Sequence, residues 1–428
     1  MTRSVSTSST DGQRIPGESR GPSVRSPDGR ARLTLQQRPA SVFVLLGVLA
    51  AGYFALTGTV WAVTGEFTRL GGQVLQLLGI DPTGWQYFET IHLEGSPIDR
   101  SDGWIVFGML AGALAAALIM GDFKWRSPRL RRRLVQGFVG GIVAGFGARL
   151  AMGCNLAAMF TGIPQFSLHA WIFTITTAVG TWFGVKVIRL RAWRGPVAVR
   201  RVERAAPPLD RAAADRRKRM IGIAVAIIMA AVVVIYLVLG QYLLAVAATF
   251  GIAFGVLIQR GQICFTAAFR DLWISGRGSL AKALVLGLGA STILTFIAIQ
   301  FGTAQIIQIS SLGTVIGGLL FGFGIVIAGG CETGMMYRAM EGQVHYFPVF
   351  AGNIVGATIL AFSWDHLGVY DLLVASGSKV NLVAEWGPGT ALIASLIVLA
   401  ICYAAIIWRE RAAKRTGETL AVSKKETA

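Results

Sequence analysis

Charged side chains are scarce in this sequence. They make up 14% of its 428 residues, whereas hydrophobic residues make up 54%, and the mean hydropathy is +0.59. This composition argues against a soluble globular enzyme and is typical of proteins that cross the bilayer many times. Because a spanning helix needs roughly 20 mostly apolar residues, and about ten such runs occur, we expect an all-α polytopic membrane protein.

Cysteine is also scarce, with four residues: Cys154, Cys264, Cys331 and Cys402. None of them forms a CxxC pair or a zinc-ligand spacing, so the sequence predicts no disulfide framework, metal site or cofactor. The GxxxxGK[ST] loop that binds ATP phosphates is absent too, so we expect no ATP hydrolysis by this chain. A cleavable signal peptide is not expected, because a long polar segment at 1–38 precedes the first apolar run.

The positive charges are concentrated. Of the 40 Lys and Arg residues, 31 lie in four segments, at 1–38, 121–134, 186–219 and 409–428. Basic residues gather in cytoplasmic loops beside membrane spans, so these segments are predicted to be cytoplasmic. The net charge of +18 could also indicate nucleic-acid binding, but the basic segments lack interleaved aromatic side chains, and we favour the membrane interpretation.

The apolar runs and basic segments together predict two membrane halves. The predicted organisation is a disordered cytoplasmic tail at 1–38, a first half at 39–188, a basic cytoplasmic linker at 189–219, a second half at 220–408 and a cytoplasmic tail at 409–428. Ten spans would place both termini in the cytoplasm, in agreement with the basic segments. The acidic stretches at 65–102 and 363–388 would then lie outside.

One stretch of twenty residues occurs twice. Residues 140–159, GGIVAGFGARLAMGCNLAAM, align with residues 317–336, GGLLFGFGIVIAGGCETGMM, with nine identical positions. The predicted topology places the first copy on an outward-running helix and the second on an inward-running helix, so the copies would be antiparallel. Inverted repeats are a transporter architecture in which the substrate path lies between the halves.

Each copy is a glycine-rich helix followed by Gly-Cys and a run too short to span the membrane. A helix that breaks at Gly153 or Gly330 and restarts as a re-entrant helix at Cys154 or Cys331 would direct unpaired N–H groups at one spot, which favours an anion. The glycines could instead serve only close helix packing, with the cysteines as small buried residues. We favour the anion site, because packing alone requires glycine and not cysteine.

The third motif is QRGQICFTAAFRDLW at 259–273, in which Arg260 and Arg270 flank Cys264, and Asp271 could pair with either arginine. Cationic neighbours would offset an incoming anion, although arginines in a cytoplasmic loop also follow from the positive-inside rule. Cys402 lies in the middle of an apolar run without polar neighbours, and we interpret it as structural.

Two charges break the symmetry of the repeat. Arg149 stands where the second copy has Val326, and Glu332 stands where the first copy has Asn155. Charges inside a membrane are costly and normally face a cavity or a partner. Glu332 is therefore a candidate proton acceptor, although an acid in the first turn of a helix is also simply stabilising.

His169 and His345 occur at nearly matching positions of the two halves. They could be substrate ligands, or they could be core histidines whose hydrogen bonds are satisfied within the protein. Thiols are soft, weak donors that suit a polarisable sulfur or selenium atom, and several weak sites in series would let an anion leave as well as enter. The residues predicted to bind substrate are Cys154, Cys264, Cys331, Gly153, Gly330, Asn155, Glu332, Arg149, Arg260, His169 and His345.

The motifs at 140–157, 260–271 and 315–334 strongly resemble those of the YeeE/YedE membrane family, whose members include thiosulfate transporters. The motif order, with IHLEGSPIDR and RAMEGQVHY, is similar to the YedE branch associated with selenium metabolism. The resemblance implies an inner-membrane importer of a small sulfur- or selenium-containing anion, with a relay at Cys154, Cys264 and Cys331. It also implies a small cytoplasmic sulfur-carrier protein of the TusA type as a partner.

Two other functions stay open at this point. A membrane thiol enzyme would transfer sulfur or selenium covalently to a cytoplasmic carrier, and it would need a resolving thiol beside its nucleophile. Two sulfurs within disulfide reach would favour that enzyme. A scaffold for a membrane reductase would not need the cysteines at all.

Overall fold

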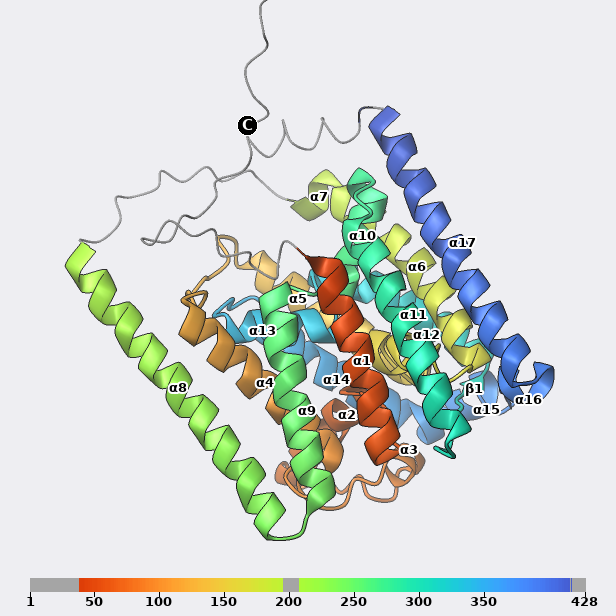
Figure 1. The fold of residues 1–428 in the computed structure, drawn as a ribbon, viewed down its shortest axis with the longest axis horizontal. Coiled ribbons are helices and arrows are strands. Elements are labelled where there is room, and N and C mark those ends of the chain that lie inside the picture. The colour runs from red at the N-terminus through yellow and green to blue at the C-terminus, as the bar shows by residue number, and fades with distance from the viewer. Residues whose placement is uncertain (1–37, 195–207, 416, 418–428) are drawn as a thin grey trace, which may run out of the picture.

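The computed structural model describes residues 38–194, 208–415 and 417, and the described chain is almost entirely helical (Figure 1). Nearly all of the predicted tail at 1–38, together with parts of the predicted linker and C-terminal tail, lies outside the described residues. The helices up to residue 194 are α1 (Pro39–Thr57), α2 (Thr64–Leu77), α3 (Gln86–Thr90), α4 (Ser101–Met120), α5 (Arg132–Leu150), the π-helix η2 (Asn155–Phe160), α6 (Leu168–Arg189) and α7 (Arg191–Arg194).

The second part of the chain is also helical and ends in a long helix. Its helices are α8 (Pro208–Val238), α9 (Tyr242–Gly261), α10 (Phe265–Ser275), α11 (Ser279–Gln300), α12 (Leu312–Ala328), α13 (Glu332–Met340), α14 (Tyr346–His366), α15 (Val369–Leu373), α16 (Leu382–Trp386) and α17 (Pro388–Arg415). Two short strands, β1 (Ile309–Ser310) and β2 (Ser378–Lys379), pair antiparallel.

Nine helical stretches in the described part of the chain are long and apolar enough to cross a membrane. Two of these join a long helix to the short helix after it, α9 to α10 and α12 to α13. Helix α5 is as long as α1 but is not among the nine, because glycines and three arginines make it less apolar. The all-α polytopic class is confirmed, and the tenth crossing, through α5, stays a prediction.

Helix boundaries differ from the sequence prediction in three places. The first apolar run of the sequence extends to Val63, but α1 ends at Thr57 because Gly58 adopts a left-handed conformation that stops the helix. Helix α8 begins at Pro208, within the predicted linker, since proline fits a first helical turn and the following Ala, Arg and Lys residues favour helix. Helix α17 continues to Arg415, seven residues into the predicted C-terminal tail at 409–428.

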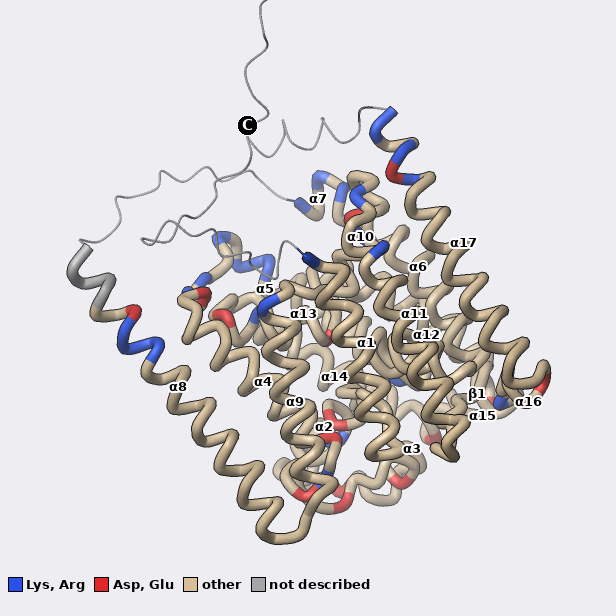
Figure 2. Tube along the Cα trace, viewed as in Figure 1, with Lys and Arg blue, Asp and Glu red and all other residues tan. Residues whose placement is uncertain are grey.

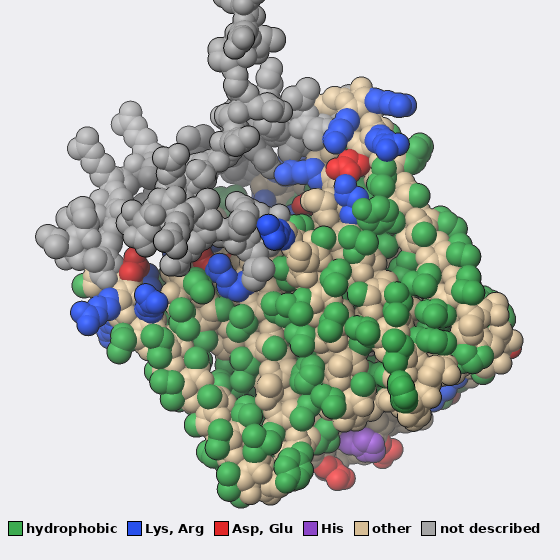
Figure 3. Space-filling model, in the orientation of Figure 1, with side chains coloured by type: hydrophobic (Ala, Val, Ile, Leu, Met, Phe, Trp, Pro, Cys, Tyr) green, Lys and Arg blue, Asp and Glu red, His purple; other side chains and the backbone are tan. Residues whose placement is uncertain are grey.

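Charged residues separate toward the two ends of the helix bundle (Figure 2). Most Lys and Arg residues lie at the end that holds α7, α10 and the start of α8, which we call the basic end. Acidic residues gather around α2, α3 and α16 at the opposite end, which we call the acidic end. Apolar side chains cover the visible face between the ends (Figure 3), as a bilayer requires.

Helices α5 and α12, which carry the two copies of the repeat, cross in close contact and run in opposite directions. A Cβ atom built on Gly147 would lie 2.5 Å from the backbone nitrogen of Phe321, and one on Gly324 would lie 2.4 Å from that of Ala144. Backbones approach this closely only where side chains are absent. Helix α5 also packs along α14, and α12 packs along α6, so equivalent helices make equivalent contacts.

The close crossing predicts that a single methyl group at its centre will be destabilising. We expect Gly324→Ala to lower the free energy of unfolding by about 1–3 kcal/mol, because the methyl group would have to displace the backbone of α5. On α11, a Cβ atom at Gly289 would have nothing within 4 Å, so Gly289→Ala is the matched control and should be neutral or stabilising. Thermal unfolding in detergent measures both variants, and equal melting temperatures would contradict the close crossing.

Candidate functional site

A short helix begins directly after each of the three motif cysteines. Cys154 is the N-cap of η2, Cys264 is the N-cap of α10 and Cys331 is the N-cap of α13. The first N–H groups of a helix have no partner within that helix and point past its N-cap. Each thiol therefore lies at a helix end that is suited to negative charge.

A left-handed residue precedes each cysteine by two positions. These residues are Met152, Gln262 and Gly329, with φ of 55°, 52° and 86°. We expected the breaks at Gly153 and Gly330, but in both copies the left-handed residue falls one position earlier. Glycine adopts this conformation freely, whereas Met152 and Gln262 are held in a region that such side chains rarely occupy. Only the glycine could have been recognised from the sequence.

The two predicted histidines satisfy backbone carbonyls at the breaks of the repeated helices. His169 Nε2 lies 2.6 Å from the oxygen of Ala151, and His345 Nε2 lies 2.8 Å from the oxygen of Ala328. The two carbonyls occupy equivalent positions of the repeat. Because a carbonyl at the end of a helix needs an external donor, these contacts favour the structural interpretation of both histidines.

Arg149 and Glu332 form a buried ion pair between the two halves. The guanidinium Nη1 and the carboxylate Oε1 are 3.0 Å apart, and the side chains are 1% and 2% exposed. Arg149 also donates to Thr68 Oγ1 at 2.6 Å and to Asn353 Oδ1 at 3.4 Å, while Thr64 donates to Glu332 at 3.3 Å. The two charges that break the repeat therefore neutralise each other.

The Cys154 thiol lies next to this ion pair, beside the Glu332 carboxylate and the Thr64 hydroxyl. We call this group of residues the Arg149 site; its members are Cys154, Arg149, Glu332, Thr64, Thr68 and Asn353. The site combines a soft thiol, a cation paired with a carboxylate, and neutral hydrogen-bonding groups. An anion that has a polarisable atom could bind here in place of the carboxylate.

The other two motif cysteines lie side by side. The thiols of Cys264 and Cys331 are neighbours, and a Cβ atom built on Gly334 would lie 2.8 Å from the first sulfur and 3.7 Å from the second. Both thiols are free. The missing side chain of Gly334 therefore lets both sulfurs lie close to the backbone of α13. We call Cys264, Cys331, Gly334 and Arg338 the dithiol site.

The guanidinium of Arg338 is the cation of the dithiol site. Arg338 was not among the residues predicted to bind substrate. Its guanidinium donates to the oxygen of Gly329 at 3.2 Å and to the hydroxyls of Tyr346 and Tyr337 at 2.6 and 2.9 Å. Within the described chain it has no carboxylate partner, so its charge is not neutralised locally. Like Arg149, Arg338 is a charge beside a cysteine motif, so its signal is present in the sequence.

Arg260 lies outside the dithiol site, contrary to the role suggested by its motif. It pairs with Asp122 at 2.8 Å, whereas Asp271 pairs with Arg270 at 2.8 Å. The positive charges acting on Cys264 are chiefly those of Arg338 and Arg270. Sequence proximity was misleading here because α9 ends, and the chain turns, between Arg260 and the cysteine.

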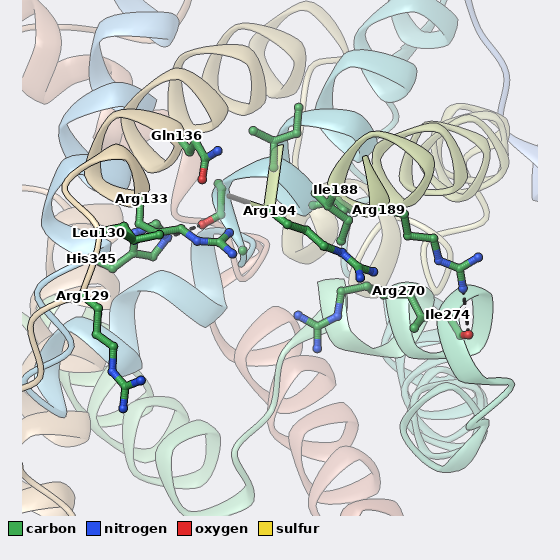
Figure 4. A pocket seen from close by; sticks show the side chains of 14 residues that line it. Arg129, Leu130, Arg133, Gln136, Ile188, Arg189, Arg194, Arg270, Ile274 and His345 are labelled. Carbon is green, nitrogen blue, oxygen red and sulfur yellow. Dashed lines mark hydrogen bonds between the residues drawn. The ribbon is translucent and has the colours of Figure 1, made fainter. Parts of the chain in front are cut away.

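A basic cavity of about 500 Å³ lies at the break that precedes Cys331. Ala328, Gly329 and His345 form part of its wall, and Figure 4 shows arginines around it from several helices. The lining arginines are Arg129, Arg133, Arg189, Arg194 and Arg270. An anion would be attracted to this cavity, which lies next to the dithiol site.

Two buried polar side chains near the cysteines lack hydrogen-bond partners in the described chain. Neither amide atom of Asn155 has a partner, and the hydroxyl of Thr266 has none. Unsatisfied buried polar groups are destabilising and uncommon. Asn155 was predicted as a substrate ligand, whereas Thr266, two residues after Cys264, was not singled out.

Comparisons with known proteins agree with this chemistry. A family model described as sulphur transport matches residues 25–183 and 260–428. The chain is 50% identical to a protein named probable transporter YedE in Salmonella typhimurium, over 89% of this chain and 94% of that protein. The same name and identity apply to a protein of Escherichia coli K12, over 88% and 94%. The chain is also 43% identical to the thiosulfate transporter TsuA of Escherichia coli, over 32% of this chain and 39% of that protein.

Proposed function

Because this chain belongs to the sulphur transport family, we propose that it imports a small sulfur- or selenium-containing anion, thiosulfate or a selenium analogue, across the bacterial inner membrane. The observation that carries the proposal is the pairing of thiols with cations at two places. Arg149 accompanies Cys154, and Arg338 accompanies Cys264 and Cys331.

The two sites divide the recognition of such an anion between soft and charged groups. A thiol is a weak donor that matches a polarisable sulfur or selenium atom, whereas a guanidinium binds the oxyanion end strongly. Asn155 and Thr266 offer free hydrogen-bonding groups beside the cysteines. Sites that bind weakly and lie in series allow the anion to move on, which is the proposed cysteine relay.

The proposed direction of transport runs from the acidic end to the basic end. Basic segments mark the cytoplasmic side, so both termini would be cytoplasmic and the basic cavity would open to the cytoplasm. The antiparallel crossing of α5 and α12 supports two inverted membrane halves joined by the segment at 189–219. The anion would then meet the Arg149 site first, the dithiol site second and the basic cavity last.

The basic cavity also supports the proposed partner. A small cytoplasmic sulfur carrier of the TusA type that presents acidic side chains would be attracted to its five arginines and would receive the anion next to the dithiol site. The cavity is thus both the exit and the docking position in this proposal.

A second function is favoured by one observation, the contact between the Cys264 and Cys331 thiols. A membrane thiol enzyme that transfers sulfur covalently needs such a neighbouring, resolving thiol. In that case a thiolate would attack the outer sulfur of thiosulfate and form a persulfide, while the S–S bond of thiosulfate breaks and the inner sulfur leaves as sulfite on the side from which thiosulfate came.

Uptake of thiosulfate labelled separately at each sulfur tests both functions. Cells that lack their own thiosulfate uptake would express the chain, with an empty vector as control, and labelled selenite would be measured in parallel. We expect both sulfur labels to accumulate equally, because a transporter moves the intact anion. Accumulation of the outer sulfur alone would indicate the thiol enzyme. Uptake of neither thiosulfate nor selenite above the empty vector would contradict the proposed import.

A further inference from the structure

We propose that the Glu332 carboxylate occupies the anion position at Arg149 and leaves it when protonated, so that an anion enters this site together with a proton. The inference rests on the proposed function and adds to it a gate and a coupling ion. The gate is built from the two residues that depart from the internal repeat. Its starting point is the 3.0 Å ion pair between their side chains.

Arg149 has three acceptors, and only one of them is charged. Thr68 and Asn353 are neutral, and Glu332 is the single carboxylate on the guanidinium within the described chain. A carboxylate and an oxyanion present similar oxygens to a guanidinium, so an incoming anion would compete with Glu332 for the same donor. While Glu332 is ionised and in place, the pair is neutral and attracts no further anion.

Other carboxylates near this part of the molecule are already matched by their own arginines. Glu66 is buried on α2 and pairs with Arg69 at 3.1 Å and with Arg100 at 2.8 Å. Arg69 also pairs with Asp102 at 2.9 Å. These residues form a separate network, so the carboxylate that neutralises Arg149 is that of Glu332.

A displaced carboxylate would have to gain a proton. An ionised carboxylate without a cation in a buried, apolar place is costly, and the group becomes neutral instead. Protonated Glu332 can donate to the neighbouring Thr64 hydroxyl or stay beside the Cys154 thiol. Arg149 then pairs with the anion, and the proton neutralises Glu332. Because one proton and one negative charge enter together, the total charge of the site does not change.

The groups around the Arg149–Glu332 pair leave Glu332 as the negative charge of this site. Thr64 from α2 contacts Glu332, whereas Thr68 from α2 and Asn353 from α14 contact Arg149, and these three side chains are neutral. Tyr87 from α3 is close enough to sense both charges, but burial raises the pKa of Tyr87 to about 12, so it stays neutral. The Cys154 thiol is the remaining titratable neighbour.

Reactivity of the Cys154 thiol tests the gate without relying on the transported substrate. Membranes containing the full-length chain would be treated with the anionic reagent 2-sulfonatoethyl methanethiosulfonate or with neutral methyl methanethiosulfonate, and modification at Cys154 would be quantified by mass spectrometry. The ratio of the two rates cancels the fraction of thiolate, because both reagents attack the same sulfur. We expect this ratio to be about tenfold higher at acid pH than at neutral pH, as protonation of Glu332 exposes Arg149 to anions.

Two variants of the ion pair complete the experiment. Glu332→Gln should give the high ratio at every pH, because its neutral amide does not neutralise the charge of Arg149. Arg149→Val/Glu332→Asn should give the low ratio at every pH, and it avoids an unpaired buried charge. A wild-type ratio that does not change with pH, an unreactive Cys154, or a Glu332→Gln variant that keeps the pH dependence would overturn the gate. Absence of thiosulfate and selenite uptake, with the expected ratios, would overturn the proposed function while supporting the gate.

Discussion

Replacing Cys154, Cys264 or Cys331 by alanine is expected to reduce thiosulfate uptake at least about tenfold, a loss that corresponds to about 1.4 kcal/mol of binding or barrier energy. Alanine removes the soft donor and leaves the cation. At the Arg149 site, Cys154 is the single thiol. At the dithiol site, the loss of either sulfur removes one of the two thiols that lie against Gly334.

The fourth cysteine provides a matched control for this series. Cys402 is exposed on α17 and belongs to neither site, so Cys402→Ala should leave uptake unchanged. Uptake would be compared at equal amounts of protein in the membrane, because a buried substitution can lower the amount of folded chain. Normal uptake in all three motif variants would rule out the cysteine relay.

Removing one partner of the buried ion pair should destabilise the protein more than removing both. Arg149→Val alone leaves a buried carboxylate without its cation, and Glu332→Asn alone leaves a buried guanidinium without its anion. Each change is expected to cost about 3–5 kcal/mol, the usual effect of an unmatched buried charge. The double variant should recover most of this loss, because it removes both charges together.

The repeat itself supplies the neutral pair for this test. Val326 and Asn155 occupy the equivalent positions of the other copies, so Arg149→Val/Glu332→Asn introduces residues that this fold already holds in an equivalent setting. Thermal unfolding of the wild type, the two single variants and the double variant in detergent forms a double-mutant cycle. Additive losses, with the double variant the least stable of the four, would show that the two charges do not stabilise each other.

Much of the fold could be predicted from local features of the sequence. Apolar runs of spanning length indicate helices, because the bilayer leaves backbone groups no other partners than those of their own helix. The glycine-rich repeat marked the helices α5 and α12, whose close contact depends on absent side chains. The cysteines at 154, 264 and 331 marked the starts of three short helices, since each follows a break in an apolar run.

The partners of the site residues could not be predicted in this way. Arg149 and Glu332 were recognised as two separate departures from the repeat, yet 183 positions separate them and no local pattern links them. Arg260 was expected beside Cys264 because it is near in sequence, but a turn of the chain directs it to Asp122. Arg338 is near Cys331 in sequence, but only the folded chain brings its guanidinium close to Cys264.

Local features of the sequence indicate the class of the protein, most of its helices, its internal repeat and the residues that bear soft or charged groups. These properties depend on short-range rules, namely hydropathy, helix length and the conformational freedom of glycine. The folded chain was needed to show that Arg149 neutralises Glu332, that Cys264 adjoins Cys331, and that Arg338 has no carboxylate partner in the described chain. The physical reason is that helices in a membrane associate through the packing of complementary surfaces. These surfaces are far apart in sequence, so packing brings together residues that no sequence spacing relates.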